Sequence, residues 1–230
     1  MGVLLTQRGN VANIANDQTA ARFITLEGGE GAGKSTQIKL LSEQLSRRRI
    51  KHITTREPGG APGAESIREL LMAGGCDRWD PVTELLLMFA ARREHCRKIV
   101  WPALENGQWV LCDRFIDSSM AYQGYAHGVG RAAVEQIQAV TLHHFVPDLT
   151  IILDMPIDTG LERVRMRGTG NRFDQLDHEF HRAVREGFLD IARREPDRCV
   201  VIDADAAPDA VAETIWQVIE QKFLQLQNCA

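Results

Sequence analysis

The sequence lacks most features that mark secreted, membrane-spanning or metal-binding proteins. Its five cysteines are scattered among 230 residues, with no Cys-x-x-Cys pair and no histidine at metal-ligand spacing. This usage predicts reduced thiols in a cytoplasmic protein rather than a disulfide framework or a zinc site. No apolar run approaches the ~20 residues that span a bilayer, and the first twenty residues lack the basic start and apolar core of a secretory signal. No association with a membrane is expected.

The sequence also has no excess of positive charge. It contains 27 Lys and Arg against 31 Asp and Glu, which gives a formal net charge of -4. This balance argues against a broad basic face for duplex nucleic acid, but it allows a local basic pocket for a small anion. Hydrophobic residues make up 44% of the chain and charged residues 25%, so neither a disordered nor a fibrous protein is indicated.

Short apolar β-prone runs alternate with longer segments of helical period, which is the pattern of a parallel sheet covered by helices on both faces. Five strands are predicted, at Phe23–Leu26, Ile50–Thr55, Trp109–Cys112, Leu149–Leu153 and Cys199–Ile202. No repeat, low-complexity tract or Pro/Gly-rich linker divides the chain. We therefore expect one α/β domain over residues 22–226, a flexible extension over residues 1–21 and a short tail over residues 227–230.

Two helical segments carry signals that define their faces or ends. Ile38, Leu41 and Leu45 share one helical face, as do Val211, Ile215, Ile219 and Leu226, and both stripes are read as core. Asp80 followed by Pro81 predicts the capped start of a helix that runs through Met88 and Arg93 toward Val100.

A glycine-rich loop follows the first predicted strand and precedes a helical segment. Residues 28–35 read Gly-Gly-Glu-Gly-Ala-Gly-Lys-Ser, which matches the P-loop pattern Gly-x4-Gly-Lys-Ser. The glycines let consecutive N–H groups point at an anion, and the helix N-terminus adds its positive end. Lys34 is expected to reach the β and γ phosphates of a nucleoside triphosphate, and Ser35 to offer a hydroxyl to Mg²⁺.

Two further stretches carry charge to the ends of predicted strands. The third strand ends in Asp113 and Arg114, so that Asp113 is expected to hold Mg²⁺ through water and Arg114 to make a forked contact to phosphate. After the fourth strand, residues 163–172 carry four arginines and two glycines. Such a composition suits a mobile lid, at about residues 163–173, that brings guanidinium groups to a transferring phosphoryl group. A solvated basic turn is the alternative.

Read together, these motifs resemble the thymidylate kinase family in its bacterial form, over about residues 22–226. Four more stretches support the resemblance, in the same order along the chain: Thr55-Arg56-Glu57-Pro58-Gly59-Gly60, Leu87-Met88-Phe89-Ala90-Ala91-Arg92-Arg93, Asp113-Arg114-Phe115 and Ala121-Tyr122-Gln123-Gly124. The resemblance implies a P-loop NTPase fold with a five-stranded parallel sheet, helices on both faces and a lid. It also implies Mg-dependent transfer of the γ-phosphoryl group of ATP to thymidine 5′-monophosphate (dTMP) within dTTP biosynthesis, by a homodimer.

The resemblance further implies roles for individual residues, carried over where the motifs match. Phe89 would stack on the thymine ring, Arg93 would hydrogen-bond a base carbonyl, and Ser119 would touch the base edge. Arg92 directly precedes Arg93, so two guanidinium groups compete for the base. The residues expected to bind ATP are Gly28, Gly29, Glu30, Gly31, Ala32, Gly33, Lys34, Ser35 and Thr36. Those expected to bind dTMP are Glu30, Arg56, Glu57, Pro58, Arg68, Phe89, Arg93, Arg114, Ser119, Tyr122 and Gln123.

Within that set, Glu30 would meet the acceptor's 3′-hydroxyl, Tyr122 would crowd the sugar C2′ position, and Arg68 with Arg114 would clamp the acceptor phosphate. The Glu57-Pro58 bond is expected to be cis.

The family divides by whether its catalytic arginine lies in the P-loop or in the lid. Here the loop carries Glu30 and Ala32 and no arginine, so the sequence resembles the lid-arginine type. The catalytic set implied is Lys34, Arg114, Arg165 and Arg172, with Arg163 and Arg167 as alternatives among the lid arginines. The metal implied is Mg²⁺ at Ser35 and Asp113. No covalent phospho-enzyme is expected, because phosphoryl transfer requires mainly alignment and charge stabilisation.

Two other functions stay open on the sequence alone. A P-loop kinase for another monophosphate or for a deoxynucleoside would share most of these motifs. A nucleotide-dependent binding module would need the P-loop but no second nucleotide pocket.

Overall fold

A computed structural model of the protein describes residues 20–168 and 172–224. The expected extension over residues 1–21 therefore falls almost wholly outside the described residues, as do Leu226 and the tail. The sheet strands are β1 (Phe23–Gly28), β2 (His52–Arg56), β3 (Trp109–Asp113), β4 (Leu149–Asp154) and β5 (Cys199–Asp203). They form one parallel sheet in the order β2-β3-β1-β4-β5, so all five predicted strands are confirmed.

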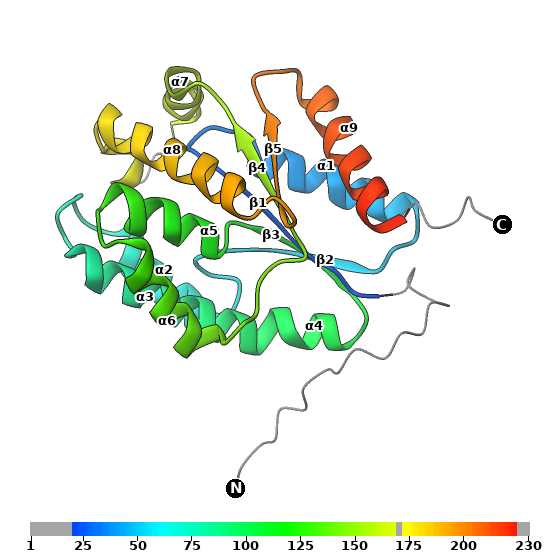
Figure 1. Ribbon diagram of the computed structural model, residues 1–230, viewed down its shortest axis with the longest axis horizontal. Helices are drawn as coiled ribbons and strands as arrows, with labels where there is room; N and C mark the ends of the chain where they lie inside the picture. The colour runs from blue at the N-terminus through cyan, green and yellow to red at the C-terminus, as the bar shows by residue number, and fades with distance from the viewer. Residues whose placement is uncertain (1–19, 169–171, 225–230) are drawn as a thin grey trace, which may run out of the picture.

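Helices cover both faces of this sheet (Figure 1). The helices are α1 (Lys34–Arg47), α2 (Pro62–Met72), α3 (Pro81–His95), α4 (Trp101–Glu105), α5 (Ile116–Ser119), α6 (Arg131–Leu142), α7 (Ile157–Arg167), α8 (His178–Arg194) and α9 (Pro208–Ile219). Three π-helical stretches, at Cys96–Val100, Met120–Ala126 and Glu220–Leu224, continue α3, α5 and α9, and a 3₁₀ turn spans Arg172–Gln175. Among the described residues, no helix is long and apolar enough to cross a membrane.

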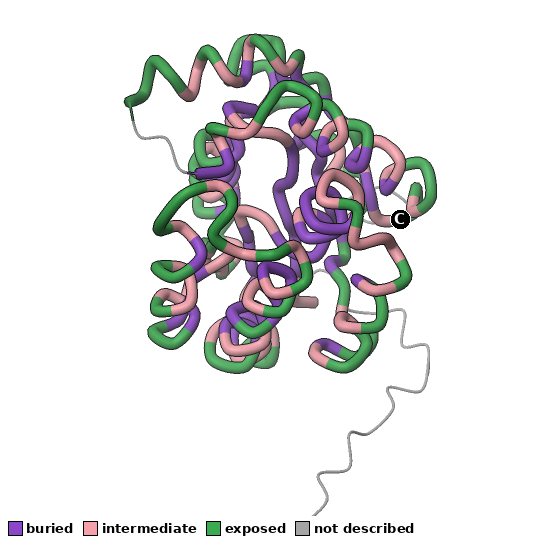
Figure 2. Tube along the Cα trace, turned by 90° about the vertical axis from the view of Figure 1, so that its left-hand side faces the viewer, coloured by how far each residue is buried: buried purple, intermediate pink, exposed green. Residues whose placement is uncertain are grey.

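Strand β1 contributes side chains to the two larger hydrophobic clusters of the protein. Its side chains alternate between the faces, so Ile24 and Leu26 join the cluster under α1 and α9, whereas Phe23 joins the cluster under α3, α6 and α8. All six residues of β1 are buried, as expected for a central strand covered on both faces, and they include the polar side chains of Thr25 and Glu27. Figure 2 shows the same arrangement, with buried strands inside and helices exposed along their outer sides.

The expected helix start at Asp80 is confirmed. The Asp80 carboxylate accepts hydrogen bonds from the backbone N–H groups of Val82 and Thr83, and Pro81 occupies the first turn. The helix runs to His95 and continues as a π-helical stretch to Val100, as the sequence predicted. The stripes at Ile38 and Val211 are buried in the core.

Candidate active site

The loop between β1 and α1 has the geometry that a phosphate cradle requires. At Gly31, with φ +72°, a Cβ atom would lie 2.0 Å from the carbonyl oxygen of Gly160, and at Gly28 it would lie 2.4 Å from that of Leu153. Only glycine fits these two positions. Gly33, with φ +89°, is the residue before α1 and brings no side chain, so the first N–H groups of the helix stay open toward the loop. The predicted strand–loop–helix motif is confirmed.

Lys34 spans the mouth of this loop. Its Nζ donates to the carbonyl oxygens of Gly28 at 3.0 Å and Gly29 at 2.8 Å, and the side chain is 8% exposed. Burial lowers the pKa of Lys34 to about 8, and the charge of Arg114 adds to this shift. The ammonium is thus held in place at the position where a phosphate oxygen can reach it.

Strand pairing brings a carboxylate beside the loop. Asp113 ends β3, which pairs with β1 so that Asp113 lies opposite Leu26. The Oγ of Ser35 donates to Asp113 Oδ2 at 3.0 Å. A hydroxyl and a carboxylate are hard oxygen donors of the kind that Mg²⁺ accepts, and one carboxylate suits an ion that keeps its waters and phosphate ligands. Within residues 20–168 and 172–224, no cluster of three or more His, Cys, Asp or Glu side chains suits a metal by itself.

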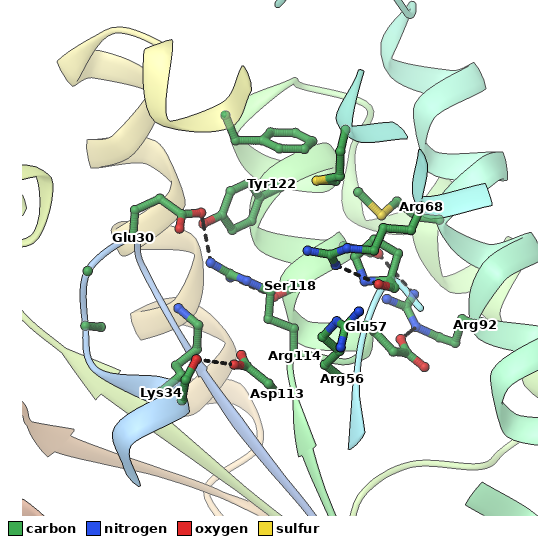
Figure 3. A pocket seen from close by; sticks show the side chains of 18 of the residues that line it. Glu30, Lys34, Arg56, Glu57, Arg68, Arg92, Asp113, Arg114, Ser118 and Tyr122 are labelled. Atoms are coloured by element: carbon green, nitrogen blue, oxygen red, sulfur yellow. Dashed lines mark hydrogen bonds and ion pairs between the residues drawn. The ribbon is translucent and has the colours of Figure 1, made fainter. Parts of the chain in front are cut away.

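A cavity of about 400 Å³ opens next to the loop, at the carboxyl ends of β1, β2 and β3 (Figure 3). Most of the expected site residues meet there. The cavity is lined by Glu30, Gly31, Ala32, Gly33, Lys34, Ser35, Thr36, Arg56, Glu57, Pro58, Arg68, Met72, Met88, Arg92, Asp113, Arg114, Ser118, Ser119, Tyr122, Gln123, Arg167 and Phe173. Gly28 and Gly29 line a smaller adjoining cavity under the loop.

Glu30, Arg114 and Tyr122 form one connected group on the wall of this cavity (Figure 3). Arg114 Nη2 donates to Glu30 Oε1 at 2.8 Å, and the Tyr122 hydroxyl donates to the same oxygen at 2.7 Å. Burial alone would raise the pKa of Glu30, but the charges of Arg114 and Lys34 outweigh it and lower the pKa to about 2. Glu30 is therefore an ionised acceptor whose two donors fix its direction.

Two more arginines face the cavity from the β2–α2 side. Arg68 Nη1 donates to the carbonyl oxygen of Pro58 at 2.7 Å, and Arg56 pairs with Glu65 at 3.0 Å. Burial lowers the pKa of Arg68, and the nearby charge of Arg56 adds to this effect. The Glu57-Pro58 bond is cis, as expected. The cavity thus offers several guanidinium groups to an anion.

The structure does not bring Phe89 and Arg93 to the cavity, which corrects the expectation for the base pocket. Phe89 is 1% exposed and lies in the core, and Arg93 donates to the Thr141 carbonyl oxygen at 2.8 Å and stacks on Trp101. Their predecessors on α3, Met88 and Arg92, line the cavity instead. A shift of one residue turns a helical side chain by about 100°. Met88 and Arg92 keep the i, i+4 spacing expected for Phe89 and Arg93, but they lie on the face of α3 that borders the cavity.

The expected catalytic arginines also need correction. Arg172 is 3% exposed, forms an ion pair with Glu84 and donates to the Leu71 carbonyl oxygen at 2.6 Å, so its guanidinium is engaged in the protein interior. Arg165 is exposed on α7 and does not line the cavity, whereas Arg167 does. The middle of the expected lid, residues 169–171, lies outside the described residues.

Four cavity residues, Met72, Met88, Ser118 and Phe173, were not among the expected site residues, whereas Arg92 and Arg167 were alternatives to the arginines chosen. For Met88 and Arg92 a signal existed, because they share the i, i+4 spacing of the pair that was chosen. For Met72 the sequence holds no signal, whereas Phe173 falls at the end of the segment expected to form the lid.

Comparison with known proteins agrees with this geometry. The sequence model of the family described as thymidylate kinase matches residues 26–215. The chain is 52% identical over 205 residues to a thymidylate kinase of Caulobacter vibrioides, covering 89% of this chain and 99% of that one. It is 48% identical over 219 residues to a thymidylate kinase of Rhodopseudomonas palustris, covering 91% and 93%.

A solved structure shows the same fold. The crystal structure of thymidylate kinase from Ehrlichia chaffeensis superposes with a TM-score of 0.71 at 37% identity, over 87% of this chain and 99% of that one. Family model, sequence relatives and fold agree over most of the chain. This protein belongs to the thymidylate kinase family.

Proposed function

We propose that the protein transfers the γ-phosphoryl group of ATP to dTMP and releases ADP and dTDP. The observation that carries this proposal is that one cavity is lined by the phosphate loop on one side and by a group of arginines on the other. A switch or motor needs only the first of these, whereas a transfer between two nucleotides needs both next to each other. Family membership supplies the identity of the acceptor.

On the donor side, the loop from Gly28 to Thr36 would bind the phosphates of ATP through its N–H groups. Lys34 would bridge the β and γ phosphates. Mg²⁺ fits the pair of Ser35 and Asp113, and when bound it would neutralise phosphate charge between donor and acceptor. Arg167 takes the place of Arg165 and Arg172 as the arginine that would stabilise charge on the transferring group, because it alone of the three lines the cavity.

On the acceptor side, Arg68 and Arg114 would hold the phosphate of dTMP, and Arg56 lines the same cavity. The ionised carboxylate of Glu30 would accept the 3′-hydroxyl, and the Tyr122 ring would exclude a 2′-hydroxyl. For the base, Met88 and Arg92 replace Phe89 and Arg93. Gln123, Ser119, Glu57 and Pro58 would complete the pocket.

Substrate comparison tests the proposal. Values of kcat/KM are measured for dTMP, dUMP, dGMP and free thymidine with Mg·ATP, and dTMP is expected to be the preferred acceptor. A preference for dUMP, dGMP or thymidine would contradict the substrate assignment. The absence of ADP formation with dTMP would instead favour a nucleotide-dependent binding module.

We also propose that the chain forms a homodimer in the cytoplasm. The family resemblance supports the dimer, and exposed Val82 and Leu86, one helical turn apart on α3, supply an apolar stripe for it. The free cysteines Cys76, Cys96, Cys112 and Cys199 suit a reducing compartment. Sedimentation equilibrium should give twice the mass of the chain, and Leu86→Glu should shift it toward the monomer.

A further inference from the structure

A buried chain of hydrogen bonds runs behind the base side of the cavity. Glu57, which follows β2, accepts from Arg92 Nε at 2.6 Å on one carboxylate oxygen and faces His95 Nδ1 at 2.8 Å on the other. His95 Nε2 lies 2.7 Å from the Thr55 hydroxyl. Glu57 lines the cavity, but both of its oxygens are already engaged within the protein. It is therefore poorly placed to contact an acceptor directly.

Each ring nitrogen of His95 faces one polar partner. Nδ1 faces a carboxylate oxygen, which can only accept, so Nδ1 carries a proton. The guanidinium of Arg92 balances the charge of Glu57, and Nε2 of the His95 ring lies within hydrogen-bond distance of the Thr55 hydroxyl. His95 is 0% exposed, so bulk solvent does not reach either bond.

The loop that carries Glu57 closes tightly on this histidine. A Cβ atom at Gly60, where φ is +83°, would lie 2.6 Å from the His95 ring and 2.6 Å from the Thr55 hydroxyl oxygen. His95 therefore packs directly against backbone at a position where only glycine fits. The His95 ring thus holds this loop against α3 by close packing as well as by hydrogen bonds.

Arg92 is the end of the chain that reaches the cavity. Its guanidinium has five N–H groups, of which one goes to Glu57, one to Ser119 Oγ at 3.0 Å and one to the Phe115 carbonyl oxygen at 2.9 Å. The rings of Phe89 and Phe115 lie 4.6 Å and 5.3 Å from its central carbon. The plane of the guanidinium is thereby fixed, while it still borders the cavity.

We propose that His95 and Glu57 are positioning residues, which act through Arg92 to set the choice of acceptor base. The inference rests on the proposed function, in which Arg92 donates to a base carbonyl. A guanidinium can donate but never accept, so a fixed Arg92 favours a base with a carbonyl at that point over one with an amino group there. Without His95, one oxygen of the buried Glu57 loses its donor, and the orientation of the Glu57–Arg92 pair relaxes.

Substitutions at position 95 test the proposal. His95→Leu removes both nitrogens, and His95→Asn keeps an N–H donor at the place of Nδ1. We measure kcat/KM for dTMP and for dCMP, which carries an amino group at the base position where dTMP has a carbonyl. In His95→Leu, the dTMP/dCMP ratio should fall by at least ~10-fold, through KM for dTMP more than through kcat, and His95→Asn should restore most of it.

His52→Leu is the matched control. His52 also uses both ring nitrogens, with Ser42 and the Ile50 carbonyl oxygen, but it lies at the start of β2 and away from the cavity. It should lose stability and keep the wild-type ratio. An unchanged ratio in His95→Leu, an equal fall in His52→Leu, or no recovery in His95→Asn would overturn the inference.

A crystal structure of His95→Leu separates this inference from the proposed function. The Arg92 guanidinium should leave its place between Phe89 and Phe115 or lose its bond to Glu57. An unmoved Arg92 would refute the positioning role, whatever the enzyme phosphorylates. A wild-type protein without activity on dTMP would instead refute the proposed function.

Discussion

At the scale of the residue, Glu27 is a fully buried acid with a raised pKa. It is 0% exposed, one residue before the P-loop, and accepts from the backbone N–H groups of Phe115 and Ser118 and from the Ser118 hydroxyl. Burial, followed by the charge of Asp117, raises its pKa to about 7, against the lowering effect of these donors and of Arg114. Glu27 therefore orders the segment that carries Arg114, whose Nη1 donates to Ser118 Oγ at 3.1 Å.

This raised pKa predicts a pH-dependent stability. Between pH ~4.5 and ~7 the unfolded chain has ionised Glu27, whereas the folded protein still holds the proton, so raising the pH favours unfolding. Glu27→Gln removes this titration. Urea unfolding at pH 5, 6, 7 and 8 should show the wild type losing stability relative to Glu27→Gln as the pH rises. A constant difference across this range would contradict the raised pKa.

Met88 and Phe89 are neighbours with different expected roles. Met88→Ala should raise KM for dTMP and leave the free energy of unfolding nearly unchanged, because Met88 is only half-buried and borders the cavity. Phe89→Ala should cost ~3–5 kcal/mol of stability, because it opens a cavity in the core. Denaturant unfolding and initial rates distinguish the two. The reverse pattern would restore Phe89 as the base contact.

At the scale of the element, α7 rests directly on the P-loop. A Cβ atom at Gly160 would lie 2.3 Å from the carbonyl oxygen of Glu30, so the two backbones touch without side chains between them. Gly160→Ala should push α7 from the loop and displace Glu30, with a fall in kcat/KM of up to ~100-fold, since small misplacements are costly in phosphoryl transfer. Glu162→Ala, at an exposed position of the same helix, is the control. Wild-type kinetics in Gly160→Ala would show that the contact is not needed.

Arg167, at the end of α7, and Arg172, in the following 3₁₀ turn, are expected to differ in role: the first in catalysis, the second in stability. Arg167→Ala should lower kcat by ~10²–10³-fold with an unchanged melting temperature, as expected for a charge-stabilising group. Arg172→Ala should cost ~3–5 kcal/mol of stability, because it leaves Glu84 buried without its partner. Single-turnover rates and thermal unfolding measure both. Loss of kcat in Arg172→Ala at full stability would return that residue to the catalytic set.

At the scale of the whole molecule, the parallel sheet gathers residues that are distant in sequence. Asp113 ends β3 and lies opposite Arg56, the last residue of β2, while β1 ends at Gly28 where the P-loop begins, so three strand ends meet at one edge of the sheet. A ligand that contacts residues at the ends of β1, β2 and β3 together should stabilise the entire fold. At a concentration of 100 Kd, dTMP should add ~2.7 kcal/mol, which raises Tm by ~5–10 °C for a domain of this size.

Thymidine is the control for this shift. It lacks the phosphate that Arg68 and Arg114 would hold, so at the same concentration it should raise Tm much less. Equal Tm shifts for dTMP and thymidine would show that the arginines do not contribute to binding of the phosphate. Differential scanning fluorimetry is sufficient for the comparison.

The sequence by itself determined the strands, the P-loop and the capped start of α3, because these follow from local patterns of apolar spacing, glycine and capping residues. It also determined the family, since the motifs occur in a specific order. The tertiary structure decided which face of α3 borders the cavity: Met88 and Arg92 line it, whereas Phe89 and Arg93 do not. It likewise placed Arg172 in a buried ion pair with Glu84 of α3. Helix phase and buried partners depend on packing between distant segments, which no local pattern encodes.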